Sequence, residues 1–164
     1  MNETQTKENE WKDAPTPNLA TYASCRVGDV ITGQLTGFEM KEETTGKKKK
    51  GTKEEEMEFR PYFTFQLTEG TTLKINKKEN RDFKPGDSVK VQGKGNLQYL
   101  IERIAAEKEG KDVKVDTKVR GDVLCLIGAF FHIQRSEDGE MNKGAFEGNP
   151  VQRYEVKWME RETQ

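Results

Sequence analysis

The sequence predicts an all-β protein with a compact core, and three observations support this fold class. Residues 58–67, EFRPYFTFQL, alternate between apolar and polar side chains, which is typical of a half-buried β-strand. Residues 27–40 show the same alternation over a longer stretch. Turn signals such as Glu69-Gly70 and Pro85-Gly86 separate the shorter alternating stretches that follow, as between the strands of a sheet.

The two faces of the predicted strand at residues 58–67 differ in chemistry. The face expected to point into the core carries Phe59, Pro61, Phe63, Phe65 and Leu67. The face expected to point outward carries Arg60, Tyr62, Thr64 and Gln66. Because Pro61 lacks an N–H group, we expect this strand to lie at a sheet edge or to carry a bulge nearby.

The first part of the chain is expected to contain five strands. They are predicted at residues 27–40, 58–67, 71–77, 87–92 and 97–104. Residues 41–57 contain six lysines and five glutamates, with no apolar residue before Met57, so we expect a solvated loop there. Residues 78–86 are expected to form a short connection that includes one helical turn.

The most apolar stretch of the chain, residues 119–133, is predicted to be a strand with apolar side chains on both faces. It follows a charged connector at residues 105–118 and precedes a last predicted strand at residues 151–159. A strand that is apolar on both faces must be covered on both faces, and the connector is too charged to do so. We therefore expect a homo-oligomer with an interface that includes Leu124, Leu126, Phe130 and Ile133.

The charge balance excludes a uniformly basic nucleic-acid binder. The chain is 32% hydrophobic and 35% charged, and its formal net charge is −1. Any binding of a polyanion therefore requires a local basic patch. Residues 74–94 provide one, because they hold seven Lys or Arg against three Asp or Glu, a local net charge of +4.

We expect a soluble cytoplasmic protein. Cys25 and Cys125 lie far apart without a CxxC motif, as reduced thiols of a cytosolic protein do. No apolar run approaches the roughly 20 residues that span a bilayer, and the N-terminus is too polar for a signal peptide. Residues 1–18 are predicted to be a disordered arm. Within it, Trp11 either docks a partner, such as a replication protein, or lies on the nearest apolar surface of this chain.

Catalytic chemistry is not expected. His132, the only histidine, lies among apolar residues in the sequence AFFHI, where a satisfied core residue is more common than a base. The sequence contains no carboxylate pair, Ser-His-Asp order, zinc-ligand spacing or phosphate-binding loop. We therefore predict a protein that is not an enzyme and that uses no cofactor or metal.

The segment KPGDSVKVQGK at residues 84–94 is similar to the fourth strand of many oligonucleotide/oligosaccharide-binding (OB) domains. Together with a long first strand, a hairpin, a connector and a closing hairpin, it resembles the OB barrel over about residues 27–104. The resemblance implies an OB-like five-stranded barrel at residues 19–108, with an additional C-terminal β-hairpin at residues 109–160. Small single-stranded DNA-binding proteins of phages and mobile elements are the most similar members, although this chain ends WMERETQ where many cellular members have a strongly acidic tail.

The resemblance implies that a ligand lies across the outer face of the second and third strands. We therefore expect sequence-tolerant binding of single-stranded DNA, or of RNA, in replication or recombination, by base stacking on outward aromatic rings and by phosphate contacts. The predicted contact residues are Gln34, Phe38, Lys47, Lys48, Lys49, Lys50, Arg60, Tyr62, Thr64, Lys74, Asn76, Lys77, Lys78 and Lys94.

Three alternatives stay open at this point. Phe38 and Tyr62 are either exposed for stacking or covered by residues 105–164. The lysine run Lys47–Lys50 either contacts phosphates or only solubilises a loop tip. The whole chain is alternatively a structural or protein-interaction module that associates with itself through residues 119–133.

Overall fold

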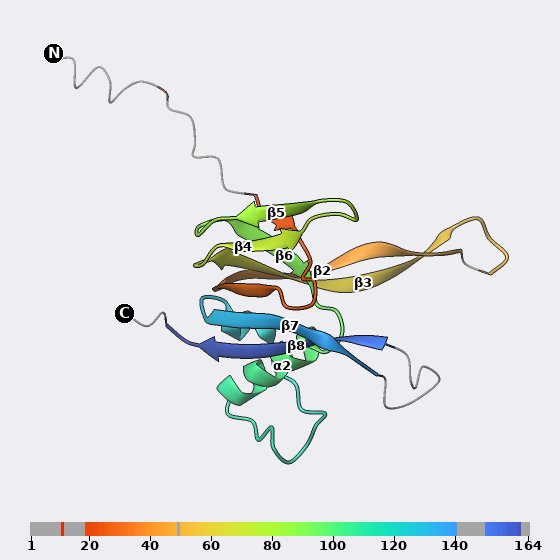
Figure 1. Ribbon diagram of the computed structural model, residues 1–164. Helices are drawn as coiled ribbons and strands as arrows, with labels where there is room; N and C mark the ends of the chain where they lie inside the picture. Colours follow the sequence, from red (N-terminus) through yellow and green to blue (C-terminus); the bar gives the residue numbers. More distant parts are fainter. Residues whose placement is uncertain (1–10, 12–18, 49, 141–149, 162–164) are drawn as a thin grey trace.

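The computed structural model describes Trp11 and residues 19–48, 50–140 and 150–161. Its elements, in chain order, are β1 (Thr21–Tyr22), β2 (Val30–Lys48), β3 (Glu55–Leu67), β4 (Thr71–Lys74), β5 (Asn80–Phe83), β6 (Ser88–Gln92), α2 (Leu97–Lys108), the 3₁₀ helix η1 (Val123–Leu126), β7 (Phe130–Glu140) and β8 (Pro150–Met159). The described chain is therefore dominated by β-structure, as predicted, and α2 is its one α-helix (Figure 1).

Six strands form one sheet in the order β1-β6-β3-β2-β7-β8, and β4 pairs with β5 in a small separate sheet. Strands β2, β3 and β6 follow one another as antiparallel neighbours, and β7 then returns to pair with β2. The order β7-β2-β3-β6 is that of a Greek key. Strands β1 and β8 are the two edges of this sheet and do not pair with each other, so the described part of the sheet is not a closed barrel.

The alternation predicted for residues 58–67 is confirmed where β3 lies within the sheet. Phe63 and Phe65 are fully buried and Leu67 nearly so, whereas Gln66 is exposed. Phe59 was predicted to lie in the core, but 65% of its surface is exposed. The reason is that β2 and β3 project beyond the other strands as a two-stranded arm, which has no layer packed on either face (Figure 1).

Pro61 lies where β3 changes from an interior strand to this free arm. Strand β6 pairs with β3 only from Tyr62 to Gln66, and the Pro61 carbonyl accepts the Gly93 N–H at 2.9 Å just beyond. The N and C=O groups of one strand residue point to the same side, so the missing N–H of Pro61 faces an edge that no strand occupies. The prediction that this strand lies at a sheet edge is therefore wrong, because β3 pairs with both β2 and β6, and Pro61 is accommodated because β6 pairs with β3 only from Tyr62 onward.

A β-bulge at Thr36 changes which face the second half of β2 presents. Leu35 pairs with Phe65, but Gly37 pairs with Thr64, so Thr36 is an extra residue without a partner on β3. Every later residue of β2 therefore has the opposite orientation to that expected from uninterrupted alternation. Phe38, predicted to point outward, lies on the core side opposite Phe63.

The predicted fifth strand at residues 97–104 is wrong, because this segment forms the first two turns of α2. The buried residues of α2 are Leu97, Ile101, Ala105 and Ala106, which line one face of a helix. Apolar residues at 97, 101, 104 and 105 follow this helical spacing, and the β-propensity of Tyr and Ile obscured it. Among the described residues, no helix has the length and apolar character needed to cross a bilayer.

The prediction of one strand over residues 119–133 is also wrong. The Asp122 side chain caps η1 by accepting the Leu124 N–H at 2.9 Å, and Gly128 has a positive φ of 97° that ends the following turn. Only residues from Phe130 onward enter β7. Val123 and Leu126 pack into the core from η1, so these two side chains of the apolar run are covered by their own chain.

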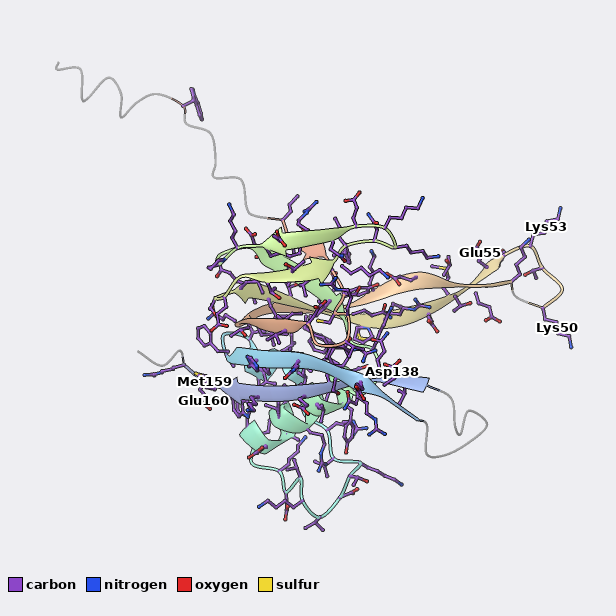
Figure 2. The ribbon with its side chains drawn as sticks, viewed as in Figure 1. Lys50, Lys53, Glu55, Asp138, Met159 and Glu160 are labelled. Carbon is purple, nitrogen blue, oxygen red and sulfur yellow. The ribbon has the colours of Figure 1, made fainter. Side chains whose placement is uncertain are left out.

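The two hairpin connections also differ from their predictions. Strand β2 continues to Lys48 and β3 begins at Glu55, so most of the expected loop at residues 41–57 is paired strand. Its tip lies at the far end of the arm, where Lys50 and Lys53 are exposed (Figure 2). The expected connection at residues 78–86 contains β5, which pairs with β4. Strands β6 and β8 lie where they were predicted.

Candidate nucleic-acid interface

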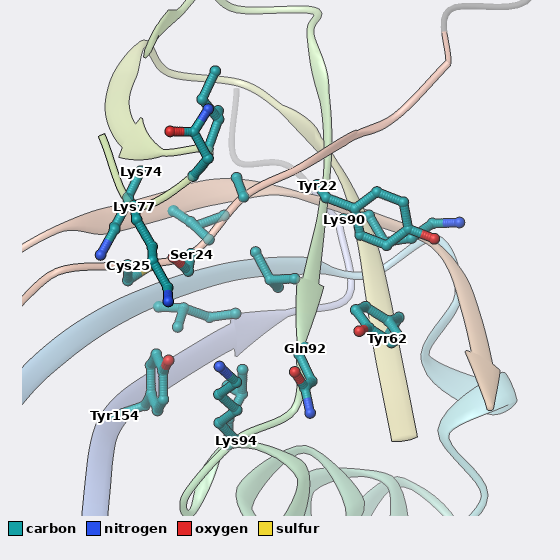
Figure 3. Close-up of a pocket in the computed structure, with 17 residues that line it drawn as sticks. Tyr22, Ser24, Cys25, Tyr62, Lys74, Lys77, Lys90, Gln92, Lys94 and Tyr154 are labelled. Carbon is teal, nitrogen blue, oxygen red and sulfur yellow. The ribbon is translucent and has the colours of Figure 1, made fainter. Parts of the chain in front are cut away.

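A cavity of about 300 Å³ opens where the edges of β6 and β8 approach each other without pairing. We call it the seam pocket. Its apolar lining includes Cys25, Ile31, Val91, Leu97 and Ile133, and its polar lining includes Tyr22, Ser24, Tyr62, Lys74, Asn76, Lys77, Lys90, Gln92, Lys94 and Tyr154. The pocket therefore combines an interior of core side chains with a cationic and aromatic rim (Figure 3).

Asn96 holds the two sides of the seam together below the pocket. Its side-chain Oδ1 accepts the Tyr154 N–H at 2.7 Å, and its Nδ2 donates to the Tyr154 carbonyl at 3.3 Å. The Asn96 N–H donates to the Gln152 carbonyl at 3.3 Å. Gly95 packs so closely on Gln152 that a Cβ would lie 1.8 Å from its carbonyl oxygen. The side chain and the backbone N–H of Asn96 thus connect to β8 where no strand-to-strand ladder forms.

The charge of the seam pocket has one sign, since its lining includes four lysines and no carboxylate. Lys90 is neutralised by Glu39, at 2.8 Å between Nζ and Oε1. Lys74, Lys77 and Lys94 form no ion pair with any described residue, and we call these three the pocket lysines. Figure 3 shows the ammonium groups of Lys77 and Lys94 pointing toward each other from opposite walls. The pocket therefore presents positive charge to an anionic ligand.

Tyr154 forms the wall of the pocket on the β8 side. Its ring is buried, and the guanidinium carbon of the buried Arg135 lies 5.6 Å from the ring centroid. The hydroxyl donates to Gln152 Oε1 at 3.1 Å. Burial raises the pKa of Tyr154 to about 12, so the hydroxyl remains protonated near neutral pH. It can donate one hydrogen bond to an anion only by exchanging Gln152 as its partner.

Cys25 does not add a nucleophile to the pocket. Burial, and to a lesser extent the nearby Asp29, raise the pKa of its thiol to about 12. A thiol with so high a pKa is almost entirely protonated at neutral pH and therefore unreactive. Both Cys25 and Cys125 are free cysteines in the structure.

The expectation that Tyr62 is exposed on the outer face is wrong. Only 7% of Tyr62 is accessible, because Tyr22 of β1 covers it edge-on with ring centroids 5.4 Å apart. The Tyr62 hydroxyl donates to Glu43 at 2.5 Å, and burial together with this bond raises its pKa to about 12. The cover comes from the N-terminal segment and not from residues 105–164. Tyr22 itself is 43% exposed and is the accessible ring on this face.

Phe38 is also unavailable for stacking in the way predicted. The bulge at Thr36 turns it inward, where its ring lies 5.1 Å from that of Phe63 and packs against the core. The expectation that Phe38 projects into solvent is therefore wrong. Its neighbours belong to the sheet itself and not to the C-terminal region.

The cations of the outer face are largely paired with carboxylates. Arg60 bonds to Glu58 at 2.6 Å and lies 3.6 Å from Glu43, and Lys41 lies 3.9 Å from the same Glu43. Lys41 also donates to the Tyr22 hydroxyl at 3.0 Å, and this bond raises its pKa. The outer face beside Arg60 is therefore close to neutral, in contrast with the seam pocket.

The remaining predicted contact residues lie outside the seam pocket. Gln34 donates to the Gly128 carbonyl at 3.0 Å, the Thr64 carbonyl accepts the Thr36 hydroxyl, and Lys78 is exposed beside Asn76. Lys48 and Lys50 are exposed on the arm, whereas Lys49 and the side chain of Lys47 lie outside what the structure describes.

Trp11 is fully exposed and so does not lie on an apolar surface of this chain.

The structure thus brings together one subset of the predicted contact residues. Lys74, Asn76, Lys77, Lys94 and Tyr62 all line the seam pocket. Sequence reasoning missed Tyr22, Lys90, Gln92 and Tyr154 as pocket residues. The sequence alternation in β6 is a signal that could have identified Lys90 and Gln92, because these residues alternate with the buried Val89 and Val91 and so share the opposite face. No local pattern places Tyr22 or Tyr154 beside them, since each is far away along the chain.

The predicted oligomer interface does not form one surface. Leu126 and Ile133 are fully buried in the core of their own chain. Leu124 is 56% exposed and Phe130 is half-buried. The expectation for Leu126 and Ile133 is therefore wrong, because residues 119–133 are not one strand and their inward side chains are covered within the chain.

Comparison with family models, with curated proteins and with solved structures found no match to this chain. The function is therefore inferred from the residues of the seam pocket and from the strand order.

Proposed function

We propose that this protein binds single-stranded nucleic acid, DNA in the first place, without strong sequence preference, through the seam pocket and the adjacent face of β6. It acts as a binding protein and not as an enzyme, in cytoplasmic DNA replication or recombination. The observation that carries the proposal is the cluster of three pocket lysines in a cavity without a lining carboxylate, on a chain with a net charge of −1. Such local cations bind a phosphate backbone, and Tyr22 beside them offers an exposed ring to a base.

The strand order supports an OB-like interpretation of the fold. An OB-fold is a partly open, five-stranded Greek-key barrel. Here the strands β2, β3, β6, β7 and β8 would take the five places, with α2 as the connector and a Greek key at the centre. In this proposal β7 and β8 are the last two barrel strands and not an added hairpin. The seam between β6 and β8 is then the point at which the barrel stays open.

The test compares two double variants that remove the same number of positive charges. Lys77→Gln with Lys94→Gln removes two pocket lysines, whereas Lys114→Gln with Lys118→Gln changes two exposed lysines in the connection between α2 and η1. Binding of a fluorescent oligothymidylate is measured by anisotropy at low salt. We expect the pocket variant to bind at least about tenfold more weakly than the wild type, since two charge-assisted contacts are lost, and the control to stay within about twofold. Equal losses in both variants would mean that only net charge matters.

Self-association remains the alternative function, and one observation favours it. Leu124 and Ile127, at and just after η1, are 56% and 45% exposed although both are large apolar residues. A second copy of the chain would remove them from water. Light scattering together with the anisotropy experiment separates the two functions, because a self-associating module without affinity for oligonucleotides would give an oligomer mass and no binding.

A further inference from the structure

The seam pocket has a volume that limits what it can hold. Its volume of about 300 Å³ is at the lower end of the range for ligand-binding cavities. A single OB fold contacts about 4–16 nucleotides of a strand. The pocket can therefore accommodate only a small part of a bound strand, on the scale of one nucleotide.

The lining is divided into an apolar part and a cationic part. Ala23 and Ile75 are half-buried and give the pocket an accessible apolar surface, and the buried Ile31, Val91 and Ile133 belong to the core behind the lining. Lys77 and Lys94 stand on opposite walls at its mouth (Figure 3). A nucleotide has the matching division, because its base has two apolar faces and its phosphate is an anion. Inorganic phosphate or a purely apolar ligand would match only one of these parts.

The amount of positive charge distinguishes between two kinds of phosphate. A phosphodiester within a strand carries one negative charge, whereas a phosphomonoester at a strand end carries between −1.5 and −2 at pH 7, as on a phosphorylated side chain. The three pocket lysines exceed what one diester needs. The N-terminus of α2 begins at Leu97 in the pocket lining and adds the positive end of the helix dipole. The charge therefore favours a terminal phosphate over an internal one.

Two amide side chains complete the lining. Asn76 Oδ1 accepts the N–H groups of Lys78 and Glu79, so Asn76 offers only the donors of its amide, whereas Gln92 offers a donor and an acceptor on one rotatable group. Such a group pairs with the edge of any base, because it can turn to present either function. This chemistry fits binding without selection of base identity.

We infer that the seam pocket binds the terminal, phosphate-bearing nucleotide of a single strand. The base lies on the apolar surface formed by Ala23 and Ile75, and the phosphate lies between Lys77 and Lys94. The inference rests on the proposed function and adds to it that the protein recognises a strand end. The remainder of the strand then leaves the pocket across the β6 face beside Tyr22.

The experiment uses the full chain and three oligothymidylates of about 20 nucleotides, longer than the site of one OB fold. One carries a 5′-phosphate, one a 3′-phosphate and one only hydroxyl ends, and each has its fluorescent label at an internal position. We expect one phosphorylated form to bind about tenfold more tightly than the hydroxyl form, since its extra charge meets unpaired lysines. The Lys77→Gln with Lys94→Gln variant should bind all three forms equally, and the Lys114→Gln with Lys118→Gln control should keep the preference.

Competition separates this inference from the proposed function. Thymidine monophosphate should displace the phosphorylated oligonucleotide at a lower concentration than either thymidine or inorganic phosphate. Equal binding of all three oligonucleotides by the wild type would overturn the inference and leave the proposed function standing. Binding of thymidine monophosphate without binding of any oligonucleotide would support the pocket assignment and overturn the proposed function. Inorganic phosphate that competes as well as the mononucleotide would overturn the nucleotide assignment and identify a simple anion site.

Discussion

Arg60 and Lys77 are both cations that the sequence suggests for phosphate binding, but their surroundings differ. The Arg60 guanidinium bonds to Glu58 at 2.6 Å and lies 3.6 Å from Glu43. A phosphate that approached Arg60 would have to compete with both carboxylates. Lys77 is a pocket lysine and has no such competitor among the described residues. At the scale of single residues, the partner of a cation therefore decides whether it is available to a ligand.

Two phenylalanines on the same side of the β2–β3 hairpin provide a prediction about stability. Phe38 packs on Phe63 with centroids 5.1 Å apart, whereas Phe59 on the arm is 65% exposed. Replacing a fully buried Phe with Ala costs about 3–5 kcal/mol, so Phe38→Ala, at a half-buried site, should lower the free energy of unfolding by about 2 kcal/mol. Phe59→Ala should change it by less than about 0.5 kcal/mol. Urea denaturation measures both values.

The opposite result would revise the orientation of β2. If Phe38→Ala left the stability unchanged while oligonucleotide binding fell, the ring would have to point outward and the bulge at Thr36 would be absent. Sequence reasoning could not resolve this point, because alternation in β2 looks continuous from Val30 onward. The single extra residue of the bulge exchanges the inward and outward faces of β2 after Thr36. No sequence signal at Thr36 predicts this bulge.

The elements show where sequence patterns were sufficient. Residues 63–67 of β3 and residues 88–92 of β6 alternate cleanly, and their buried and exposed sides follow the pattern. The pattern failed for α2, because LQYLIERI fits a short strand by propensity and a helix by spacing. It also failed for residues 119–133, where the contacts of η1 with α2 and β2 decide the structure. Residues whose environment comes from distant elements, such as Tyr22 and Tyr154, could not be placed in the site.

The Asn96 side chain makes two of the hydrogen bonds that join the start of α2 to β8, which gives a prediction at the scale of elements. The substitution Asn96→Ala removes both side-chain bonds to the Tyr154 backbone. The half-buried N–H group of Tyr154 then has no acceptor. We expect a loss of about 1–3 kcal/mol in the free energy of unfolding. Asn80→Ala, at an exposed position of β5, is the matched control and should cost less than about 0.5 kcal/mol. Chemical denaturation followed by tryptophan fluorescence reports both.

An equal effect of the two substitutions would show that Asn96 does not hold the seam. Hydrogen exchange gives a second readout for the same point. In Asn96→Ala the Tyr154 amide should exchange faster than in the wild type, since its acceptor is lost, while amides in the centre of β3 should keep their relative protection.

At the scale of the whole molecule, positive charge is divided between two places. One is the seam pocket, and the other is the tip of the β2–β3 arm, where Lys50 and Lys53 lie far from the C-terminal end of β8 (Figure 2). The arm extends seven residues from Lys41 to Lys48, which is about 24 Å along a strand. A short ligand in the seam pocket therefore cannot touch the tip, whereas a long strand has the reach to do so.

This separation predicts that the salt dependence of binding changes with ligand length. For single strands the logarithm of the binding constant falls with the logarithm of salt concentration by about 0.7 per phosphate contacted, so the three pocket lysines give a slope of about −2. An oligonucleotide of about 6 nucleotides should show this slope in the wild type and in the Lys48→Ser with Lys50→Ser variant alike. With about 30 nucleotides, the wild-type slope should be steeper, and the variant should lose about 1 unit of it.

Lys114→Ser with Lys118→Ser is the control for net charge. An unchanged slope for the long strand would mean that the arm lysines only solubilise the hairpin tip, and an equal change for both lengths would mean that the tip folds back onto the seam pocket.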